Sequence, residues 1–272
     1  MKQAILGCYV KLVICVILLM FSWTVNAAGI LIQGAMDVEL QEYIQKLQNV
    51  VQKNIDGFQF WLGNLEGVPV IISKTNIGEI NAGVATTLAI KNYSPDLIIN
   101  QGLIGGYPRS LHRDDIVVAN KIINASAVTA PNLPAGSGVF FKQIDESRDY
   151  MPTYFTPPIN LVALVANHFE VKGYHVKVGA ILSSDRWSNE VDYVSWFSRK
   201  YDIFGEEMEG AASAQVAQIY KIPFLSVRVV SNSLLNNESY QETTAQTGQS
   251  YILALLPKIA ELYKIQLVET TH

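Results

Sequence analysis

The sequence predicts an α/β fold, a three-layer sandwich in which a central mixed β-sheet is flanked by helices. Apolar strand patterns alternate with helical patterns along the chain, which is typical of sheets covered by helices. The segments 58–62 and 68–73 flank a Gly-Asn-Leu-Glu-Gly turn, so they read as a β-hairpin that makes the sheet mixed. The 272 residues are 49% apolar and 16% charged, enough for one large domain with a sizeable core.

The first half of the chain is expected to supply the opening strand, the hairpin and two helices. The opening strand at 29–34 runs into a helix whose apolar residues recur at spacings of four, three and four: Leu40, Ile44, Leu47 and Val51. After the hairpin, a helix of small residues at 81–91 precedes strands at 96–100 and 115–119. A glycine loop at 102–106 separates these two strands.

The second half begins with a long segment, 129–158, that is rich in proline, glycine and aromatic residues and has no clean period. It is expected to be irregular, as functional lids and interface loops often are. Regular elements then alternate again: helix 159–171, strand 175–182, helix 190–200, strand 224–230 and a C-terminal helix at 241–263.

The N-terminus carries the pattern of a secretory signal peptide. Two lysines accompany an apolar run at 12–21 that is too short to span a bilayer unaided, and Val-Asn-Ala at 25–27 fits a cleavage site. Residues 1–27 are therefore expected to be removed, which leaves a single domain at 28–272. That domain would be exported, periplasmic or secreted, without stable membrane insertion; an uncleaved anchor would leave it on the same side of the membrane.

The mature chain would be mildly acidic and free of thiols. The full chain has 20 basic and 24 acidic residues; loss of two lysines leaves 18 against 24, a net charge of −6. This balance excludes a basic nucleic-acid binder. Both cysteines, Cys8 and Cys15, leave with the signal peptide, which suits an oxidising compartment. No metal site is expected, because the histidines lack ligand spacing: His112, His168, His175 and His272.

Polar residues gather where predicted strands end, and open α/β sheets bind ligands at the carboxyl ends of their strands. In Gly-Ala-Met-Asp-Val-Glu at 34–39, Glu39 could face a substrate, although from spacing alone an acidic first helical turn capped by Asp37 is favoured. The glycine loop at 102–106 would let backbone N–H groups approach a ligand, although a simple turn explains it almost as well. Neither a GxGxxG motif nor a P-loop is present, so no nucleotide cofactor is expected.

A third candidate is Glu206-Glu207-Met208-Glu209, which precedes a helix start of small residues at 210–214. Three carboxylates in four residues at a strand end are costly to bury without partners. A ribose diol can donate two charge-assisted hydrogen bonds to one carboxylate. Acidic residues also favour a helix N-terminus, and this simpler explanation suffices for Glu206 but not for Glu209.

The fourth candidate is the end of the strand at 224–230. Arg228 lies within this apolar strand and needs a carboxylate partner, which Glu207 or Glu209 could supply. Asn232 follows it and could be an ordinary turn residue. Together with the acidic motif, Arg228 and Asn232 indicate a site.

These motifs resemble, in the same order, those of methylthioadenosine/S-adenosylhomocysteine nucleosidases, members of the purine nucleoside phosphorylase superfamily. The resemblance covers essentially the whole mature chain and also includes Ser-Ser-Asp-Arg-Trp at 183–187. Its most specific parts are Glu-Met-Glu-Gly-Ala at 207–211 and the later Arg-x-x-Ser at 228–231.

The resemblance implies a purine nucleosidase that hydrolyses the N-glycosidic bond of methylthioadenosine or S-adenosylhomocysteine and needs no cofactor. Glu39 would be the general base that activates water at the anomeric carbon, and Arg228 would orient the acidic groups around the ribose. The resemblance also implies a homodimer, with the stretch Tyr150–Phe155 as a candidate contributor from the partner. The remaining substrate-binding residues would be Glu207, Met208 and Glu209 around the ribose, Trp187 against the purine, and Gly102 and Leu103 in the glycine loop.

Two departures leave the purine open. The family pattern ends in Asp, which protonates N7 of the leaving base; here Asn232 can hydrogen-bond N7 but cannot deliver a proton. An amide could face either a 6-amino or a 6-oxo group, so a 6-oxopurine nucleosidase of the futalosine type is one alternative. Leu103 stands where many relatives carry a small polar residue.

Two further alternatives concern the reaction. Phosphorylases of the superfamily bind phosphate with an arginine in the loop that corresponds to 34–39, and this chain has none there. Phosphate beside Glu39 would be repelled, although Arg109 and Arg113 in a later loop could contribute to a phosphate site. The other alternative is an exported protein that binds nucleosides without turning them over; Asn232 favours it, whereas Glu39 and Glu209 favour catalysis.

Overall fold

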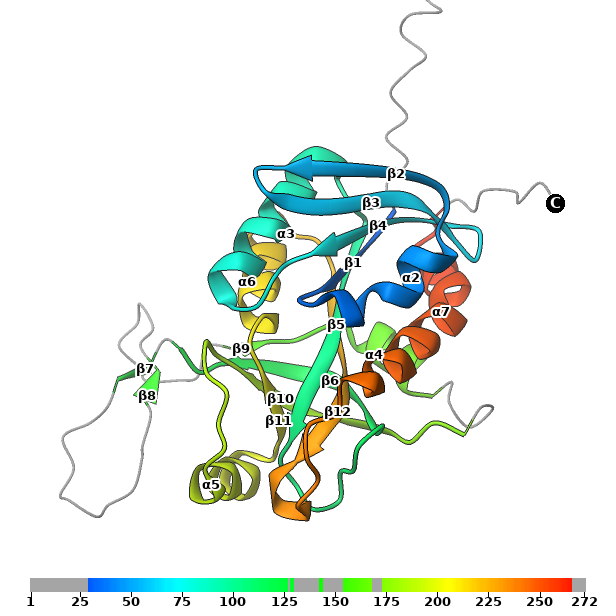
Figure 1. Cartoon of the computed structure of the whole chain (residues 1–272). Helices are drawn as coiled ribbons and strands as arrows, with labels where there is room; N and C mark the ends of the chain where they lie inside the picture. Colours follow the sequence, from blue (N-terminus) through cyan, green and yellow to red (C-terminus); the bar gives the residue numbers. More distant parts are fainter. Residues whose placement is uncertain (1–28, 127, 130–141, 144–153, 168–172, 266–272) are drawn as a thin grey trace, which may run out of the picture.

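The computed structural model describes residues 29–126, 128–129, 142–143, 154–167 and 173–265 (Figure 1). The predicted signal peptide at 1–27 and most of the Tyr150–Phe155 stretch lie outside the described residues.

The described residues form one large mixed sheet. Its order is β11-β10-β6-β12-β5-β1-β4-β3-β2, and β9 pairs with β6. Because β11 also pairs with β5, the strands from β5 to β11 close on themselves. The bounds of these strands are β1 (Ile30–Gly34), β2 (Gln48–Ile55), β3 (Phe58–Leu65), β4 (Val68–Lys74), β5 (Leu97–Gly106), β6 (Ile116–Asn124), β9 (Tyr154–Phe155), β10 (Val176–Ser183), β11 (Ile203–Glu207) and β12 (Phe224–Ser233). A separate two-stranded sheet pairs β7 (Val128–Thr129) with β8 (Lys142–Gln143).

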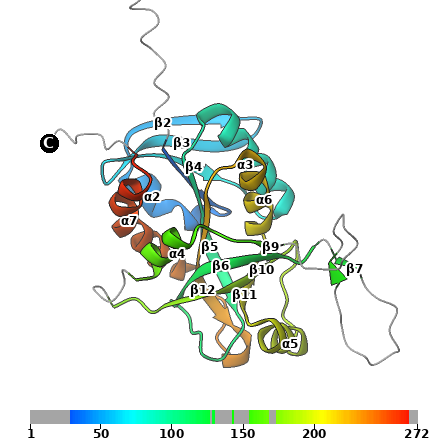
Figure 2. The same cartoon turned by 180° about the vertical axis from the view of Figure 1, so that it is seen from behind.

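Helices cover both faces of the sheet, as Figures 1 and 2 show. Along β1, Ile30 and Ile32 pack toward one cluster and Leu31 toward the other, because side chains alternate along a strand. The first cluster includes residues of α4 and α7; the second includes the small residues of α6 and part of α3. The helices are α2 (Gln41–Lys46), α3 (Glu79–Tyr93), α4 (Ile159–Ala166), α5 (Val191–Tyr201), α6 (Gly210–Tyr220) and α7 (Ala245–Leu262), with short 3-10 turns at η1 (Asp37–Glu39), η3 (Leu234–Asn236) and η4 (Glu242–Thr244).

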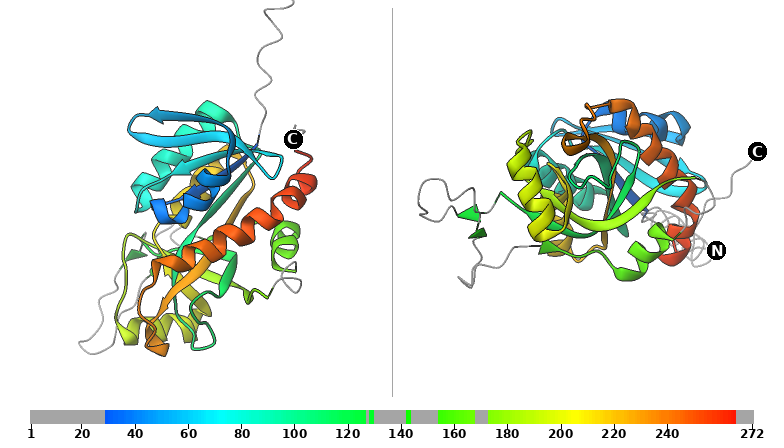
Figure 3. Two further views of the ribbon diagram at one scale, coloured as in Figure 1. Left: turned by 45° about the vertical axis from the view of Figure 1, so that its right-hand side comes forward. Right: turned by 90° about the horizontal axis from the view of Figure 1, so that it is seen from below.

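This arrangement confirms the predicted α/β sandwich with a central mixed sheet, and it also confirms the hairpin. Figure 3 shows α7 running along the outside of the molecule. No helix in the described part of the chain is both long and apolar enough to cross a membrane.

The predicted helix through Val51 is wrong in its second half. Helix α2 ends at Lys46, and Val51 lies in β2, opposite Leu62 of β3. The apolar spacing is compatible with a helix, but Val50 and Val51 face solvent, and pairing with β3 satisfies their backbone groups instead. The hairpin is therefore the inner part of a three-stranded antiparallel extension.

The predicted glycine loop at 102–106 is also wrong, because these residues are the end of β5. Gly102 pairs with Arg228 of β12, and Gly105 pairs with Glu206 of β11. Glycine is required here for close packing, since a Cβ on Gly102 would lie 2.5 Å from Oε1 of Glu39. The glycines therefore let β5 pair with β12 on one edge and β11 on the other, and they leave room for the carboxylate of Glu39 on its face.

Candidate active site

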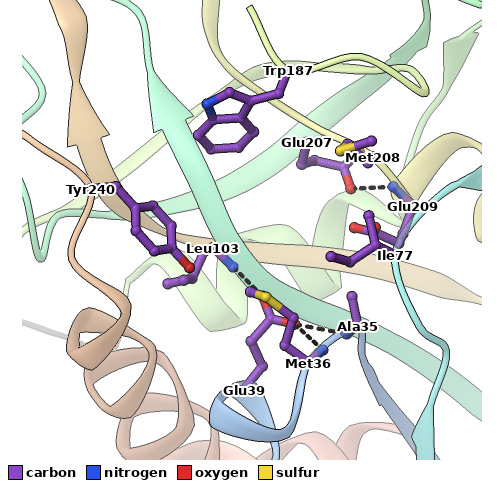
Figure 4. A pocket seen from close by; sticks show the side chains of 10 residues that line it. All are labelled: Ala35, Met36, Glu39, Ile77, Leu103, Trp187, Glu207, Met208, Glu209 and Tyr240. Carbon is purple, nitrogen blue, oxygen red and sulfur yellow. Dashed lines mark hydrogen bonds between the residues drawn. The ribbon is translucent and has the colours of Figure 1, made fainter.

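A cavity of about 350 Å³ opens where several parallel strands end (Figure 4). Residues that follow β1, β4, β10 and β11 converge there, together with the last residue of β11, one residue of β5 and one that precedes η4. Open α/β sheets bind ligands at this position. Its lining comprises Ala35, Met36, Glu39, Ile77, Leu103, Trp187, Glu207, Met208, Glu209 and Tyr240.

Glu39 ends the 3-10 turn η1 and points its carboxylate into the cavity (Figure 4). Its Oε2 accepts hydrogen bonds from the backbone N–H groups of Ala35 (2.7 Å) and Met36 (3.0 Å), and its Oε1 accepts one from Leu103 (2.8 Å). Burial raises the pKa of Glu39, and this effect outweighs the hydrogen bonds and the positive charge of Arg228, which lower it. A fixed carboxylate with a raised pKa suits a general base.

Asp37 and Glu39 do form an acidic first turn, η1, but Asp37 does not cap it. Asp37 is exposed and pairs with Lys74 at 2.8 Å, and the N-cap of the turn is Met36. The buried carboxylate of Glu39 accepts the backbone N–H of Met36, the N-cap residue of this turn, and it also faces the cavity, so its structural and functional roles coexist.

Glu209 is the N-cap residue of α6, and its carboxylate also lies in the cavity. Its Oε1 accepts a hydrogen bond from the backbone N–H of Gly78 at 2.9 Å. Burial, followed by the neighbouring carboxylate of Glu207, raises the pKa of Glu209 to about 8. Donors from a ligand, such as sugar hydroxyls, would favour the charged form of this group.

Glu207 is the partner that Arg228 requires. Its Oε2 lies 2.5 Å from Nη2 of Arg228 and also accepts the backbone N–H groups of Glu209 (3.0 Å) and Gly210 (2.8 Å). The guanidinium bonds the side chain of Asn100 as well. Arg228 is buried beneath the cavity and does not line it, and its contact with the lining is the salt bridge to Glu207.

Trp187 and Tyr240 form the opposite side of the cavity (Figure 4), with their rings edge to face at 6.4 Å between centroids. Asn232 lies at this end, because its Nδ2 and the Trp187 ring are 3.7 and 3.6 Å from the Cβ position of Gly105. The hydroxyl of Ser231 donates to Oδ1 of Asn232 at 2.9 Å. The amide therefore turns its NH₂ group toward the aromatic end.

Six candidates from the sequence lie together in the lining of this cavity: Glu39, Leu103, Trp187, Glu207, Met208 and Glu209. Gly102, Arg228 and Asn232 lie next to it, outside the lining.

Sequence reasoning missed four lining residues: Ala35, Met36, Ile77 and Tyr240. The first two lie inside a motif already singled out, so their position beside Glu39 was a usable signal. Ile77 and Tyr240 come from segments without a pattern, and only the folded chain places them at the cavity.

Three other charged residues that the sequence analysis considered do not line the cavity. Glu206 lies buried in β11, so it is not a helix-terminal acid. Arg109 and Arg113 donate to the backbone carbonyls of Leu235 and Ser239 and do not line the cavity. Among the described residues, no group of three or more histidine, cysteine, aspartate or glutamate side chains could hold a metal ion.

Comparison with known proteins agrees with this geometry. The family model described as "Phosphorylase superfamily" matches residues 29–256. The 5′-methylthioadenosine/S-adenosylhomocysteine nucleosidase of Bacillus pumilus is 33% identical over 202 residues, covering 73% of this chain and 83% of that protein. The nucleosidase of the same name from Halalkalibacterium halodurans is 29% identical over 232 residues, covering 83% and 96%.

Among solved structures, a 5′-methylthioadenosine/S-adenosylhomocysteine nucleosidase from Colwellia psychrerythraea in complex with adenine has the same fold. Its TM-score is 0.71 at 26% identity, and the match covers 85% of this chain and 96% of that one. The sheet, the cavity at its strand ends and these matches show that this chain belongs to the phosphorylase superfamily, as a member similar to the 5′-methylthioadenosine/S-adenosylhomocysteine nucleosidases.

Proposed function

We propose that the protein is a purine nucleosidase that hydrolyses the N-glycosidic bond of 5′-methylthioadenosine and S-adenosylhomocysteine type nucleosides. The observation that carries this proposal is the pair of buried carboxylates, Glu39 and Glu209, which face one cavity with an aromatic end. One carboxylate can hold a water and the other a sugar diol, and the aromatic end can hold a base. The similarity to relatives that are named 5′-methylthioadenosine/S-adenosylhomocysteine nucleosidases supports this proposal.

In the proposed reaction, the ribose hydroxyls donate to Glu209 and the purine lies against Trp187. Glu39 accepts a proton from a water that forms the new bond to the anomeric carbon, while the bond from that carbon to the base breaks. The electron pair of the broken bond stays on the base, which gains a proton from solvent. Glu207 and Glu209 lie next to each other at the cavity. The salt bridge with Arg228 neutralises the charge of Glu207, so only Glu209 is left to receive the ribose hydroxyls.

Water is favoured over phosphate as the nucleophile. The lining residues include glutamates but neither lysine nor arginine in the part of the chain that the structure describes. Arg109 and Arg113 are directed at backbone carbonyls instead. A phosphate dianion would therefore meet negative charge without a counter-ion.

A second candidate function is hydrolysis of a 6-oxopurine nucleoside of the futalosine type. The NH₂ group of Asn232 faces the aromatic end, because Oδ1 is held by Ser231. Two N–H donors match the two neighbouring acceptors of a 6-oxopurine, N7 and O6, whereas a 6-amino group offers a donor there.

The test is a mass-spectrometric screen of methylthioadenosine, S-adenosylhomocysteine, adenosine, inosine and futalosine, each with and without phosphate. Release of free adenine without phosphate is the expected result. Preferential release of the oxopurine base would select the second candidate, and a requirement for phosphate would indicate a phosphorylase. Binding without base release over hours would contradict a nucleosidase and indicate a nucleoside-binding protein.

We also propose a homodimer whose interface lies beside the cavity. Ile77, Ile80 and Val84 are 51%, 79% and 42% exposed, and their spacing places them on one side of α3 and of the residues that lead into it. Ile77 also lines the cavity, so a second copy on this side would narrow its mouth. Sedimentation velocity of Ile80→Glu is expected to show a monomer with weaker nucleoside binding; a wild-type monomer would contradict the proposal.

The proposed location is outside the cytoplasm, after cleavage of residues 1–27. The N-terminal pattern of the sequence is its support. N-terminal sequencing of the protein from the exported fraction is expected to begin at Ala28; a cytoplasmic product beginning at Met1 would contradict it.

A further inference from the structure

Glu206 is a buried carboxylate that the proposed reaction does not use. It is 1% exposed and lies one residue before Glu207 on β11, so its side chain points away from the ribose end of the cavity. A buried carboxylate is costly unless specific donors hold it. Its partners therefore indicate its role.

Hydrogen bonds from Tyr107 and Ser188 hold this carboxylate. Oε2 accepts the hydroxyl of Tyr107 at 2.7 Å, and Oε1 accepts the backbone N–H of Ser188. Tyr107 is itself buried directly after β5, where its backbone N–H donates to the carbonyl of Phe204 at 2.9 Å. The carboxylate therefore joins the rigid sheet to the segment that contains Ser188.

That segment carries Trp187, which lines the aromatic end of the cavity and is 38% exposed. Residues 185–190 join β10 to α5 without regular structure, so side-chain contacts must hold them. On the N-terminal side, the carboxylate of Asp185 accepts the backbone N–H of Glu79 at 2.6 Å. Next to Trp187, the guanidinium of Arg186 contacts Tyr193 of α5 on one side, and the backbone N–H of Ser188 donates to Glu206 on the other.

We propose that Glu206, supported by Tyr107, is a positioning residue that fixes Trp187 for stacking on a purine base. The inference rests on the proposed function in one respect, that the base lies against Trp187. It assigns Glu206 no contact with substrate. Its loss therefore weakens base binding and raises KM, and it leaves kcat nearly unchanged, because Glu39 and Glu209 keep their own partners.

The first measurement needs no ligand. Amide hydrogen exchange of the full chain is expected to accelerate at 186–190 in Glu206→Ala and to stay at the wild-type rate in Glu190→Ala, a matched change at an exposed residue of the same segment. Equal exchange rates in the two variants would contradict the claim that Glu206 holds this segment in place.

The second measurement is equilibrium binding of adenine. We expect Glu206→Ala to weaken it by roughly tenfold, which is part of the value of a base–aromatic stack. Glu206→Gln keeps an oxygen for the N–H of Ser188 and should restore binding to within about threefold of wild type, because only the charge assistance is lost. Tyr107→Phe keeps the ring packed and removes the hydroxyl. Its affinity for adenine should lie between those of Glu206→Ala and Glu206→Gln.

A double-mutant cycle separates positioning from a general structural role. If Glu206 acts through Trp187, the effect of Glu206→Ala on adenine binding must vanish in a Trp187→Ala background. An effect of equal size in both backgrounds would overturn the proposal. Wild-type protein that binds no purine would contradict the proposed function instead, and the exchange experiment would still decide whether Glu206 anchors the segment.

Discussion

Glu39 has its chemistry set by three backbone N–H groups and by burial. The N–H bonds hold the carboxylate in one orientation, and exclusion of water raises its pKa. A side chain held in this way needs no rearrangement when a water arrives.

Glu39→Gln is therefore expected to lower kcat by roughly 10²- to 10⁴-fold, the usual value of a general base. Binding of a nucleoside should change little, because Glu209 and Trp187 keep their positions. Steady-state kinetics combined with calorimetric binding checks both parts. Unchanged kcat would remove Glu39 from the mechanism.

Asn232 is the residue at which this chain departs from its family's pattern. Its NH₂ group can hydrogen-bond a leaving base but cannot transfer a proton to it. Asn232→Asp is expected to raise kcat for adenine nucleosides by about tenfold or more, since a carboxyl group there can act as a general acid.

The matched control is Asn189→Asp, which adds the same charge at an exposed position two residues from Trp187. Kinetics of both variants on methylthioadenosine and inosine make the comparison. A higher kcat in both variants would indicate an effect of negative charge alone. A lower kcat in Asn232→Asp would show that the reaction requires the amide group of Asn232.

At the scale of the element, α3 and α6 are joined to β1 by a buried polar network. The hydroxyl of Thr86 donates to the carbonyl of Ala82 (2.7 Å) and lies 3.1 Å from the hydroxyl of Ser213, and the side chain of Gln33 donates to it at 2.9 Å. Removing one member of such a network leaves the others unpaired.

Thr86→Val should lower the free energy of unfolding by about 1–3 kcal/mol, because Gln33 and Ser213 lose a partner in a dry environment. Thr87→Val is the control. Thr87 is half-buried, and within the described part of the chain its hydroxyl donates to the carbonyl of Gly83 in the preceding turn. Urea unfolding of both variants measures the difference. Equal losses would show that the network adds nothing beyond one local bond.

Elements whose pattern is local could be predicted from the sequence, and those defined by a distant partner could not. The hairpin consists of two short apolar segments around a glycine turn of its own, so its strands were found. Val51 fits a helical spacing, and only β3 beside it makes it a strand residue. The glycines of β5 read as a loop because nothing nearby shows that β11 and β12 lie on both sides.

The same distinction applies to the site. Glu39 and Glu209 stand at strand ends inside dense polar motifs, so chemistry pointed to them. Tyr240 comes from a loop far along the chain and gave no signal. Glu206 was misread because its neighbours in sequence are acidic, whereas its role depends on Tyr107 and Ser188, which are distant in sequence.

For the whole molecule, the buried carboxylates make stability depend on pH. Burial raises the pKa of Glu209 from 4.5 to about 8, so the folded protein keeps a proton that the unfolded chain releases between these values. The free energy of unfolding should therefore fall as pH rises from 4.5 to 8 and level off above. Glu39, whose pKa is also raised, adds to the same slope.

Urea unfolding at pH 5, 6, 7 and 8 checks this expectation. Glu209→Gln should flatten the slope because its side chain does not titrate, and Glu242→Gln, an exposed control, should keep it. Identical slopes in the two variants would contradict the assignment. Nucleoside binding near pH 7 should also release protons, seen as a dependence of the binding enthalpy on the buffer.

The three N–H groups on Glu39 also limit how many molecules it can serve. A carboxylate has about four lone-pair positions, and Ala35, Met36 and Leu103 occupy three of them. One acceptor position remains, which is enough for a single O–H group arriving from a single direction. The hydrogen bonds already made by Glu39, more than the width of the cavity, therefore select a nucleophile that donates one O–H group, and water is the smallest such molecule.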